Sequence, residues 1–125
     1  MNCFKNRLNC FKKSNRDNGE YTGDMSGIYP FRKKNGKGIF KYSNGNVYEG
    51  DWLNNDRHGK GKMTYINGHI YEGEWKNNKM EGEGVFTWPD GRKYVGSYID
   101  DKKEGHGVFY WPDGRKYDGM WLDGK

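Results

Sequence analysis

Few residues of this 125-residue sequence have a type and spacing suited to chemistry. The three histidines, His58, His69 and His106, fall at three different places of a repeating pattern, and no two have the spacing of metal ligands. The four serines lie in no nucleophile context, and neither cysteine has a histidine near it in sequence. We therefore expect no catalytic residue, no bound metal and no cofactor, and we predict that the chain is not an enzyme.

Acidic residues cluster within one stretch, but charge pairing explains them. Glu72, Glu74 and Glu83 fall at alternating positions that point to one face of a predicted sheet, where Lys60 and Lys62 of the preceding segment also point. Opposite charges on neighbouring strands stabilise a solvent-facing sheet surface. These carboxylates therefore give no reason to predict acid–base catalysis.

A Gly-x-Gly pattern recurs, and it superficially resembles a phosphate-binding loop. The dinucleotide fingerprint also needs a third glycine and a following helix, and the pattern supplies neither. We attribute these glycines to packing. They occupy residues 36–38, 59–61, 82–84 and 105–107.

The elements that must position all these residues come from a repeat of 23 residues. Its units are 25–47, 48–70, 71–93 and 94–116, followed by an incomplete unit, 117–125. Position 1 of a unit is Tyr except at Met25, position 5 is Trp or Tyr, and positions 3, 12, 14 and 21 are Gly. A fixed period of this length indicates an array of small stacked units, preceded here by a basic segment and linker over 1–24.

The alternation within each unit predicts β-strands. Positions 1, 3 and 5 and positions 12, 14, 16 and 18 are aromatic or Gly, with mostly polar residues between them, which is the period of a half-buried strand. We expect a loop at positions 6–11 and a tight Asn-Gly or Asp-Gly turn at positions 20–21. Each unit is then a β-hairpin in an all-β meander. The glycines leave room for the rings to lie over bare backbone, so Gly84→Val should be costly.

Charge is unevenly distributed along the chain. The net charge is +5, and residues 1–47 hold ten basic and three acidic residues, a charge of +7. We therefore expect an anionic partner, such as anionic membrane lipid, at this end. Nucleic acid is not an expected partner, because the interleaved aromatic residues are needed as core. The predicted lipid contacts are Arg32, Lys33, Lys34, Lys37 and Lys41.

Residues 1–24 contain Asn-Cys-Phe-Lys twice. The spacing of seven residues puts Cys3 and Cys10 on one side of a short helix among basic residues, which favours S-acylation and a membrane-surface anchor. A disordered basic tail explains the same residues. The sequence has no apolar stretch of membrane-spanning length and no secretory signal, so we expect an intracellular, reducing setting.

The face opposite the rings changes character towards the C-terminus. It is mostly charged in the first three units but carries a group of apolar residues later. Such a group marks a contact site for another protein or a second copy of the chain. The last strand, 117–121, lacks a partner strand, so either the sequence continues or this edge pairs with another molecule. The predicted patch is Val85, Val95, Ile99, Val108, Tyr110, Met120 and Leu122.

The unit YEGEWKNNKMEGEGVFTWPDG resembles the MORN (membrane occupation and recognition nexus) repeat over residues 25–125. Departures are Met25 at position 1, and Tyr29 and Tyr98 at position 5; an insertion of four residues would instead start the first unit at Tyr21. The resemblance implies a single-layer twisted antiparallel sheet that serves protein contacts, membrane association or dimerisation, without catalysis. Junctophilins, radial spoke head proteins and plant phosphatidylinositol phosphate kinases carry such repeats.

Three functions follow as expectations. The first is a non-enzymatic scaffold for other proteins in the cytoplasm, cytoskeletal or ciliary. The second is an adaptor on the cytoplasmic membrane face that binds anionic lipid through its basic end. The third is a targeting region of a larger enzyme, such as a phosphatidylinositol phosphate kinase.

Overall fold

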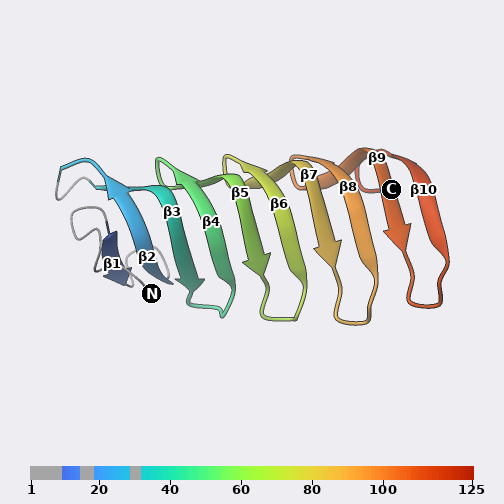
Figure 1. Cartoon of the computed structure of the whole chain (residues 1–125), viewed down its shortest axis with the longest axis horizontal. Coiled ribbons are helices and arrows are strands. Elements are labelled where there is room, and N and C mark those ends of the chain that lie inside the picture. The colour runs from blue at the N-terminus through green and yellow to red at the C-terminus, as the bar shows by residue number, and fades with distance from the viewer. Residues whose placement is uncertain (1–9, 15–18, 29–31) are drawn as a thin grey trace.

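The computed structural model describes residues 10–14, 19–28 and 32–125, with only the backbone described for 10–14, and these residues form one open antiparallel sheet (Figure 1). Each strand pairs with the next along the chain, so the predicted single-layer sheet of consecutive hairpins is confirmed. The strands are β1 Cys10–Ser14, β2 Gly19–Ser26, β3 Lys33–Tyr42, β4 Val47–Leu53, β5 Asp56–Thr64, β6 Ile70–Lys76, β7 Lys79–Thr87, β8 Lys93–Ile99, β9 Lys102–Tyr110 and β10 Lys116–Trp121.

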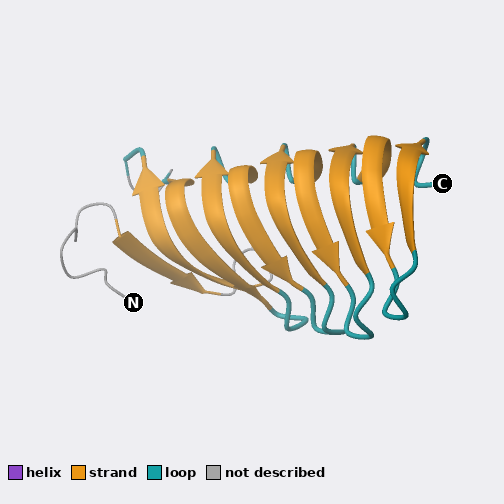
Figure 2. Cartoon of the chain, turned by 45° about the vertical axis from the view of Figure 1, so that its right-hand side comes forward, coloured by secondary structure: helices purple, strands orange, loops and turns teal. Residues whose placement is uncertain are grey.

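A row of facing glycines crosses the whole array. Gly50 on β4 faces Gly61 on β5, Gly61 faces Gly73 on β6, and the row continues in this way from Gly23 on β2 to Gly119 on β10. The strands bend and curl along their length (Figure 2). The face that carries the aromatic rings is called the inner face below, and the opposite face is called the outer face.

The tyrosine at position 1 of each unit lies over this glycine row. A Cβ atom on Gly61 would stand 2.1 Å from the hydroxyl oxygen of Tyr48, a separation that no side chain tolerates. The Tyr48 hydroxyl donates a hydrogen bond of 2.9 Å to the Asp51 carbonyl, so the buried polar tip is satisfied. Bare backbone thus provides the space for each ring, as predicted. The four rings held in this way are fully buried: Tyr21, Tyr48, Tyr71 and Tyr94.

The rings also connect one hairpin to the next. The Trp52 ring stands edge-on to Tyr48 of its own hairpin, with centroids 5.0 Å apart, and edge-on to Tyr21 of the preceding hairpin at 5.4 Å. The Trp52 indole nitrogen donates to the Gly38 carbonyl at 3.1 Å. Tyr98 takes the same place between Tyr71 and Tyr94, with both centroid distances 5.3 Å. Edge-to-face pairs of this kind are favourable, so the core is one continuous row of rings.

The prediction of a loop at positions 6–11 is wrong, because the two strands of the β4–β5, β6–β7 and β8–β9 hairpins continue into these positions and are joined by a turn of only two residues. Asn54 and Asn55 are the turn residues of the β4–β5 hairpin, and both have positive φ angles, 48° and 73°. A two-residue turn with two left-handed residues matches the natural twist of a hairpin. Asn and Asp tolerate this conformation better than other non-glycine residues. Pairs of Asn or Asp therefore shorten the connection and lengthen both strands.

Each two-residue turn also docks on the preceding hairpin. The Asn78 backbone N–H donates to the Arg57 carbonyl at 3.1 Å, and the Arg57 N–H donates to the Asn78 Oδ1 atom at 2.8 Å. The same pair of bonds joins Asp101 to Met80. These bonds hold successive hairpins at a fixed spacing at the end of the strands where the two-residue turns lie.

The start of the array differs from the predicted boundary between residues 24 and 25. Strand β2 crosses that boundary, and Tyr21, rather than Met25, occupies the buried place of Tyr48 in the next unit. Met25 faces Lys34 across the strands just as Trp52 faces Arg57, so Met25 takes the place of the position-5 ring. The first unit therefore begins at Tyr21 and contains the insertion of four residues.

The helix expected near the N-terminus is not formed by the described part of that segment. Cys10 begins strand β1, which pairs with β2. Cys3 lies outside the described residues.

We predict that Gly84→Val lowers the free energy of unfolding by about 3 kcal/mol. A Cβ atom at Gly84 would lie 2.3 to 2.5 Å from atoms of the Tyr71 ring, and that ring cannot move because Trp75 and Tyr98 hold it from both sides. Urea unfolding followed by tryptophan fluorescence measures the change. Thr87→Val, on the outer face of the same strand, is the control and should change stability little. Equal effects of the two substitutions would contradict the packing role of Gly84.

Candidate protein-interaction surfaces

The predicted apolar patch contains a continuous row of three valines. Val85 on β7 faces Val95 on β8, and Val95 faces Val108 on β9. Val95 is 37% exposed, and the other two are half-buried. Directly facing pairs bring side chains on the same face into contact across strands. The structure therefore places these three predicted residues together on the outer face.

The other patch residues divide between two places. Tyr110 lies two residues beyond Val108 on the same strand, and the Lys93 Nζ atom stands 5.1 Å from the centre of its ring. Met120 faces His106, whose Nε2 atom lies 2.6 Å from the Asp118 Oδ1 atom. This polar pair separates the valine row from the remaining apolar residues, which lie towards the two-residue turns. Those residues are strongly exposed: Ile99, Met120 and Leu122.

The predicted lipid contacts are not all accessible. Lys33, Lys37 and Lys41 on β3 are exposed, but Lys34 is only 4% exposed. Its Nζ atom lies between 5.1 and 5.6 Å from the centres of three rings, those of Tyr21, Phe40 and Trp52. Lys34 is thus part of the ring layer and cannot contact a membrane surface, which corrects that part of the prediction.

The side chains of two further predicted lipid contacts interact with other residues of the fold. The Lys37 ammonium forms an ion pair with Asp51. The Arg32 side chain is half-buried and donates to the Met25 carbonyl at 3.4 Å. The exposed positive charge at this end of the array is therefore smaller than the sequence suggests.

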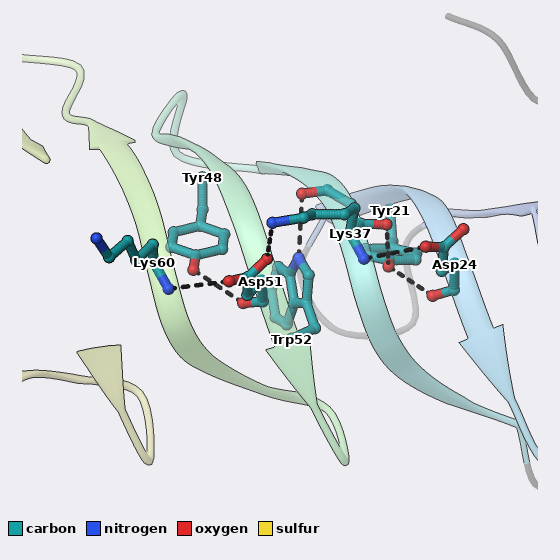
Figure 3. Close-up of polar contacts among 8 residues, drawn as sticks. Tyr21, Asp24, Lys37, Tyr48, Asp51, Trp52 and Lys60 are labelled. Carbon is teal, nitrogen blue, oxygen red and sulfur yellow. Dashed lines mark hydrogen bonds and ion pairs between the residues drawn. The ribbon is translucent and has the colours of Figure 1, made fainter. Parts of the chain in front are cut away.

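A feature that sequence reasoning missed is the carboxylate at position 4 of the first three hairpins. Pairing is interrupted between Gly50 and Trp52, and the facing strand has Gly59 at a positive φ of 67°. Asp51 accepts the backbone N–H of Lys60 at 3.0 Å across this irregularity (Figure 3). A β-bulge leaves such a backbone group without a ladder partner, so a nearby carboxylate satisfies it. Asp24 and Glu74 make the equivalent bonds, to the N–H groups of Lys37 and Glu83.

Asp51 is the most heavily used of these carboxylates. It accepts from Lys60 N and also pairs with the Lys37 ammonium (Figure 3). Partial burial acts to raise the pKa of Asp51, but the hydrogen bonds from Lys37 and Lys60 outweigh burial and hold the pKa below its usual value. The signal in the sequence is the recurrence of Asp, Asp and Glu three residues after the buried tyrosine.

Cations recur on the inner face at position 10, a position that had been assigned to a loop. The occupants in successive units are Lys34, Arg57, Met80 and Lys103. The Arg57 guanidinium carbon lies 5.0 Å from the centre of the Trp75 ring, and it is also near the rings of Tyr42 and Tyr48. Cations over ring faces at these distances are attracted to them.

Lys103 has the same kind of environment at the other end of the array. Its Nζ atom lies 5.5 to 5.7 Å from the ring centres of Trp88, Tyr94 and Trp121. Burial lowers the pKa of Lys103, because the charged form loses hydration there. Burial of the Tyr94 hydroxyl likewise raises the pKa of that group to about 12.

A hollow of about 400 Å³ opens beside Arg57 on the inner face. It contains two cationic side chains and two amide side chains against three aromatic rings. The lining residues are Lys34, Phe40, Tyr42, Trp52, Asn55, Arg57 and Asn78.

The histidines have individual structural surroundings. His69 stands edge-on to Phe86 with ring centres 5.7 Å apart, and His106 pairs with Asp118. Within the described residues, no three His, Cys, Asp or Glu side chains are grouped so that they could hold a metal ion. The same part of the chain contains no helix of a length and apolarity suited to crossing a membrane.

Comparison with known families identifies the repeat. The family model of the MORN repeat matches residues 33–47, 48–70, 71–91 and 94–114, which together make up more than half of the chain. The chain therefore belongs to the MORN repeat family. Repeats of this family are generally non-catalytic modules and are often involved in protein or membrane interaction.

No curated protein matches the sequence. Among solved structures, the chain is similar to the SAS-4 (dCPAP) TCP domain in complex with a proline-rich motif of Ana2 (dSTIL) of Drosophila melanogaster. The identity is 14%, the match covers 90% of each chain, and the TM-score is 0.38, which is too low to support an inference.

We predict that Asp51→Asn lowers stability at neutral pH by about 1 kcal/mol, since it removes the charge from a hydrogen-bonded carboxylate. The folded-state pKa of Asp51 lies below its unfolded value, so its stabilising contribution is present at neutral pH and is lost as the pH falls through the folded-state pKa. Urea midpoints measured from about pH 7 to pH 3 should show the two proteins converging at low pH.

Glu49→Gln on the same strand is the matched control for this experiment. Among the described residues, the backbone N–H groups that donate to carboxylates on this face donate to Asp24, Asp51 and Glu74 and not to Glu49, so Glu49→Gln should leave the pH profile close to that of the unaltered protein. A constant difference between Asp51→Asn and the unaltered protein at every pH would refute the charge-based explanation.

Proposed function

We propose that this chain is a non-enzymatic scaffold that holds other proteins through the apolar patch of its outer face. The observation that carries the proposal is the row formed on the outer face by Val85, Val95 and Val108, of which Val95 is exposed and the other two are half-buried. The aromatic core lies on the other face, so packing of the folded chain does not require valine at these positions. Apolar side chains gathered on a surface gain free energy when a partner covers them.

The contrast along the row supports this assignment. On β4, β5 and β6 the same cross-strand row is occupied by Glu49, Lys62 and Glu72, so that residues of opposite charge face each other. On the next three strands the row is occupied by valine. A sheet surface that only faces solvent has no need of this change, whereas a surface that docks a partner does.

The proposal extends to the kind of partner that the patch binds. We favour a cytoskeletal or ciliary protein in the cytoplasm, and a second copy of this chain is the other protein that fits the patch. Affinity purification from the native cell identifies the partner, and sedimentation of the purified chain detects self-association.

We predict that the double substitution Val95→Glu, Val108→Glu weakens capture of the partner, or self-association, at least about tenfold, because two charges would be buried at the centre of the contact. The control is Thr22→Glu with Thr64→Glu, which adds the same charge to the outer face of β2 and β5. Both variants should unfold at urea midpoints close to that of the unaltered protein. The proposal is contradicted if the Val95→Glu, Val108→Glu variant recovers as much partner as the unaltered protein and has the same mass in sedimentation.

A second candidate function is an adaptor on anionic membranes. The observation in its favour is that Lys33, Lys37 and Lys41 are exposed along β3, and the sequence before β2 also contains Cys3 and Cys10. Basic residues near an anionic surface each add roughly 1 kcal/mol of attraction, and an acyl chain adds a second anchor.

Liposome co-sedimentation tests this adaptor. Protein from its native cell should bind vesicles that contain phosphatidylserine and should bind less in high salt, because salt screens the lysines. Lys37→Glu with Lys41→Glu should reduce binding, and so should Cys3→Ser with Cys10→Ser. Binding that persists in high salt and in the cysteine variant would contradict this mechanism.

A further inference from the structure

Two cations on the inner face have no acidic partner. Among the described residues, no carboxylate lies within ion-pair distance of Arg57 or Lys103. Both side chains are half-buried against aromatic rings, which replace only part of the hydration that a charge loses. In contrast, Arg92 and Arg115, which also lie over tryptophan rings, each have an aspartate partner.

The third unit shows that the fold does not need a cation at this position. Met80 occupies the same place on β7, is half-buried and packs against the ring layer. A neutral, flexible side chain therefore covers the rings adequately. The charges of Arg57 and Lys103 are more costly to bury than a thioether, so their presence calls for a role outside the fold.

The surroundings of Arg57 suit a carboxylate. One terminal nitrogen of its guanidinium donates to the Tyr42 hydroxyl, and the other donates to the Asn78 carbonyl at 2.7 Å. Each terminal nitrogen carries a second hydrogen, and two such hydrogens match the two oxygens of a carboxylate. The hollow beside Arg57 is lined by no Asp or Glu among the described residues, so a carboxylate entering it would meet only cations, amides and rings.

From this arrangement we propose that the inner face binds an extended acidic segment of a partner protein, with one carboxylate at Arg57 and a second at Lys103. The two cations lie four strands apart, or about 19 Å at about 4.8 Å per strand. In an extended chain, side chains six residues apart point the same way and are about 20 Å apart.

This inference rests on the proposed function, in that the array holds other proteins, but it concerns the opposite face. A peptide is favoured over a lipid surface because the cations lie half-buried between rings. A flat bilayer cannot follow the rings into the hollow, whereas an extended chain can place single side chains there.

The experiment uses a fluorescent peptide of nine residues with Glu at its second and eighth positions and neutral polar residues elsewhere. Anisotropy titration with the full chain should give saturable binding, and a peptide with Gln at both acidic positions should bind at least about tenfold more weakly. Arg57→Met and Lys103→Met should each weaken binding at least about fivefold. Arg57→Met reproduces the natural occupant of the third unit, so its urea midpoint reports whether the fold is retained.

The proposal is overturned if the acidic peptide does not bind, or if Arg57→Met and Lys103→Met bind it as well as the unaltered chain. Vesicles containing phosphatidylserine serve as the alternative ligand. If the chain binds these vesicles but not the acidic peptide, the proposal is overturned and the inner face binds lipid instead.

The peptide experiment is independent of the outer-face patch. The Val95→Glu, Val108→Glu variant should bind the acidic peptide with unchanged affinity. Loss of peptide binding in that variant would contradict a separate inner-face site, whereas failure of partner capture alone concerns only the outer-face scaffold.

Discussion

The structure depends on close contact between a tyrosine ring and a glycine of the neighbouring strand. A single-layer sheet has no second layer to cover its apolar face, so the rings must be buried against the sheet itself. Facing glycines make this possible, because any Cβ atom in the row would overlap a ring or the next strand. Edge-to-face contacts then pass from hairpin to hairpin, and the core becomes a row of rings rather than a globular interior.

This constraint divides the molecule into parts that the fold uses and parts that it leaves free. The glycines, the buried tyrosines and the Asn or Asp turns repeat because each hairpin needs them. The outer face and position 10 of the inner face can vary from unit to unit, and there the chain departs from its own pattern. The hydrogen bonds between each turn and the preceding hairpin keep the hairpins at a fixed spacing. Side chains at one repeat position are therefore presented to a partner at regular intervals.

Several features could be predicted from the residues because they depend on local pattern. Alternation of rings and glycines indicated strands, and the same alternation put Val85, Val95 and Val108 on the face opposite the rings. Other features depend on how two strands are aligned. The bulge opposite Gly59 directs the Lys60 N–H towards Asp51, and no spacing along the chain reveals that pairing. The burial of Lys34 likewise depends on three rings from three different strands.

By itself, the sequence determined the repeat, the hairpin as its unit, the single-layer sheet and the family. These follow from periodicity, and periodicity is a property of the chain alone. Only the tertiary structure decided that the array begins at Tyr21, that the turns have two residues, and that Arg57 and Lys103 lie among rings without an acidic partner. The physical reason is that burial and pairing are set by neighbouring strands, and a cation on a strand has the same sequence signature whether water or an aromatic ring surrounds it.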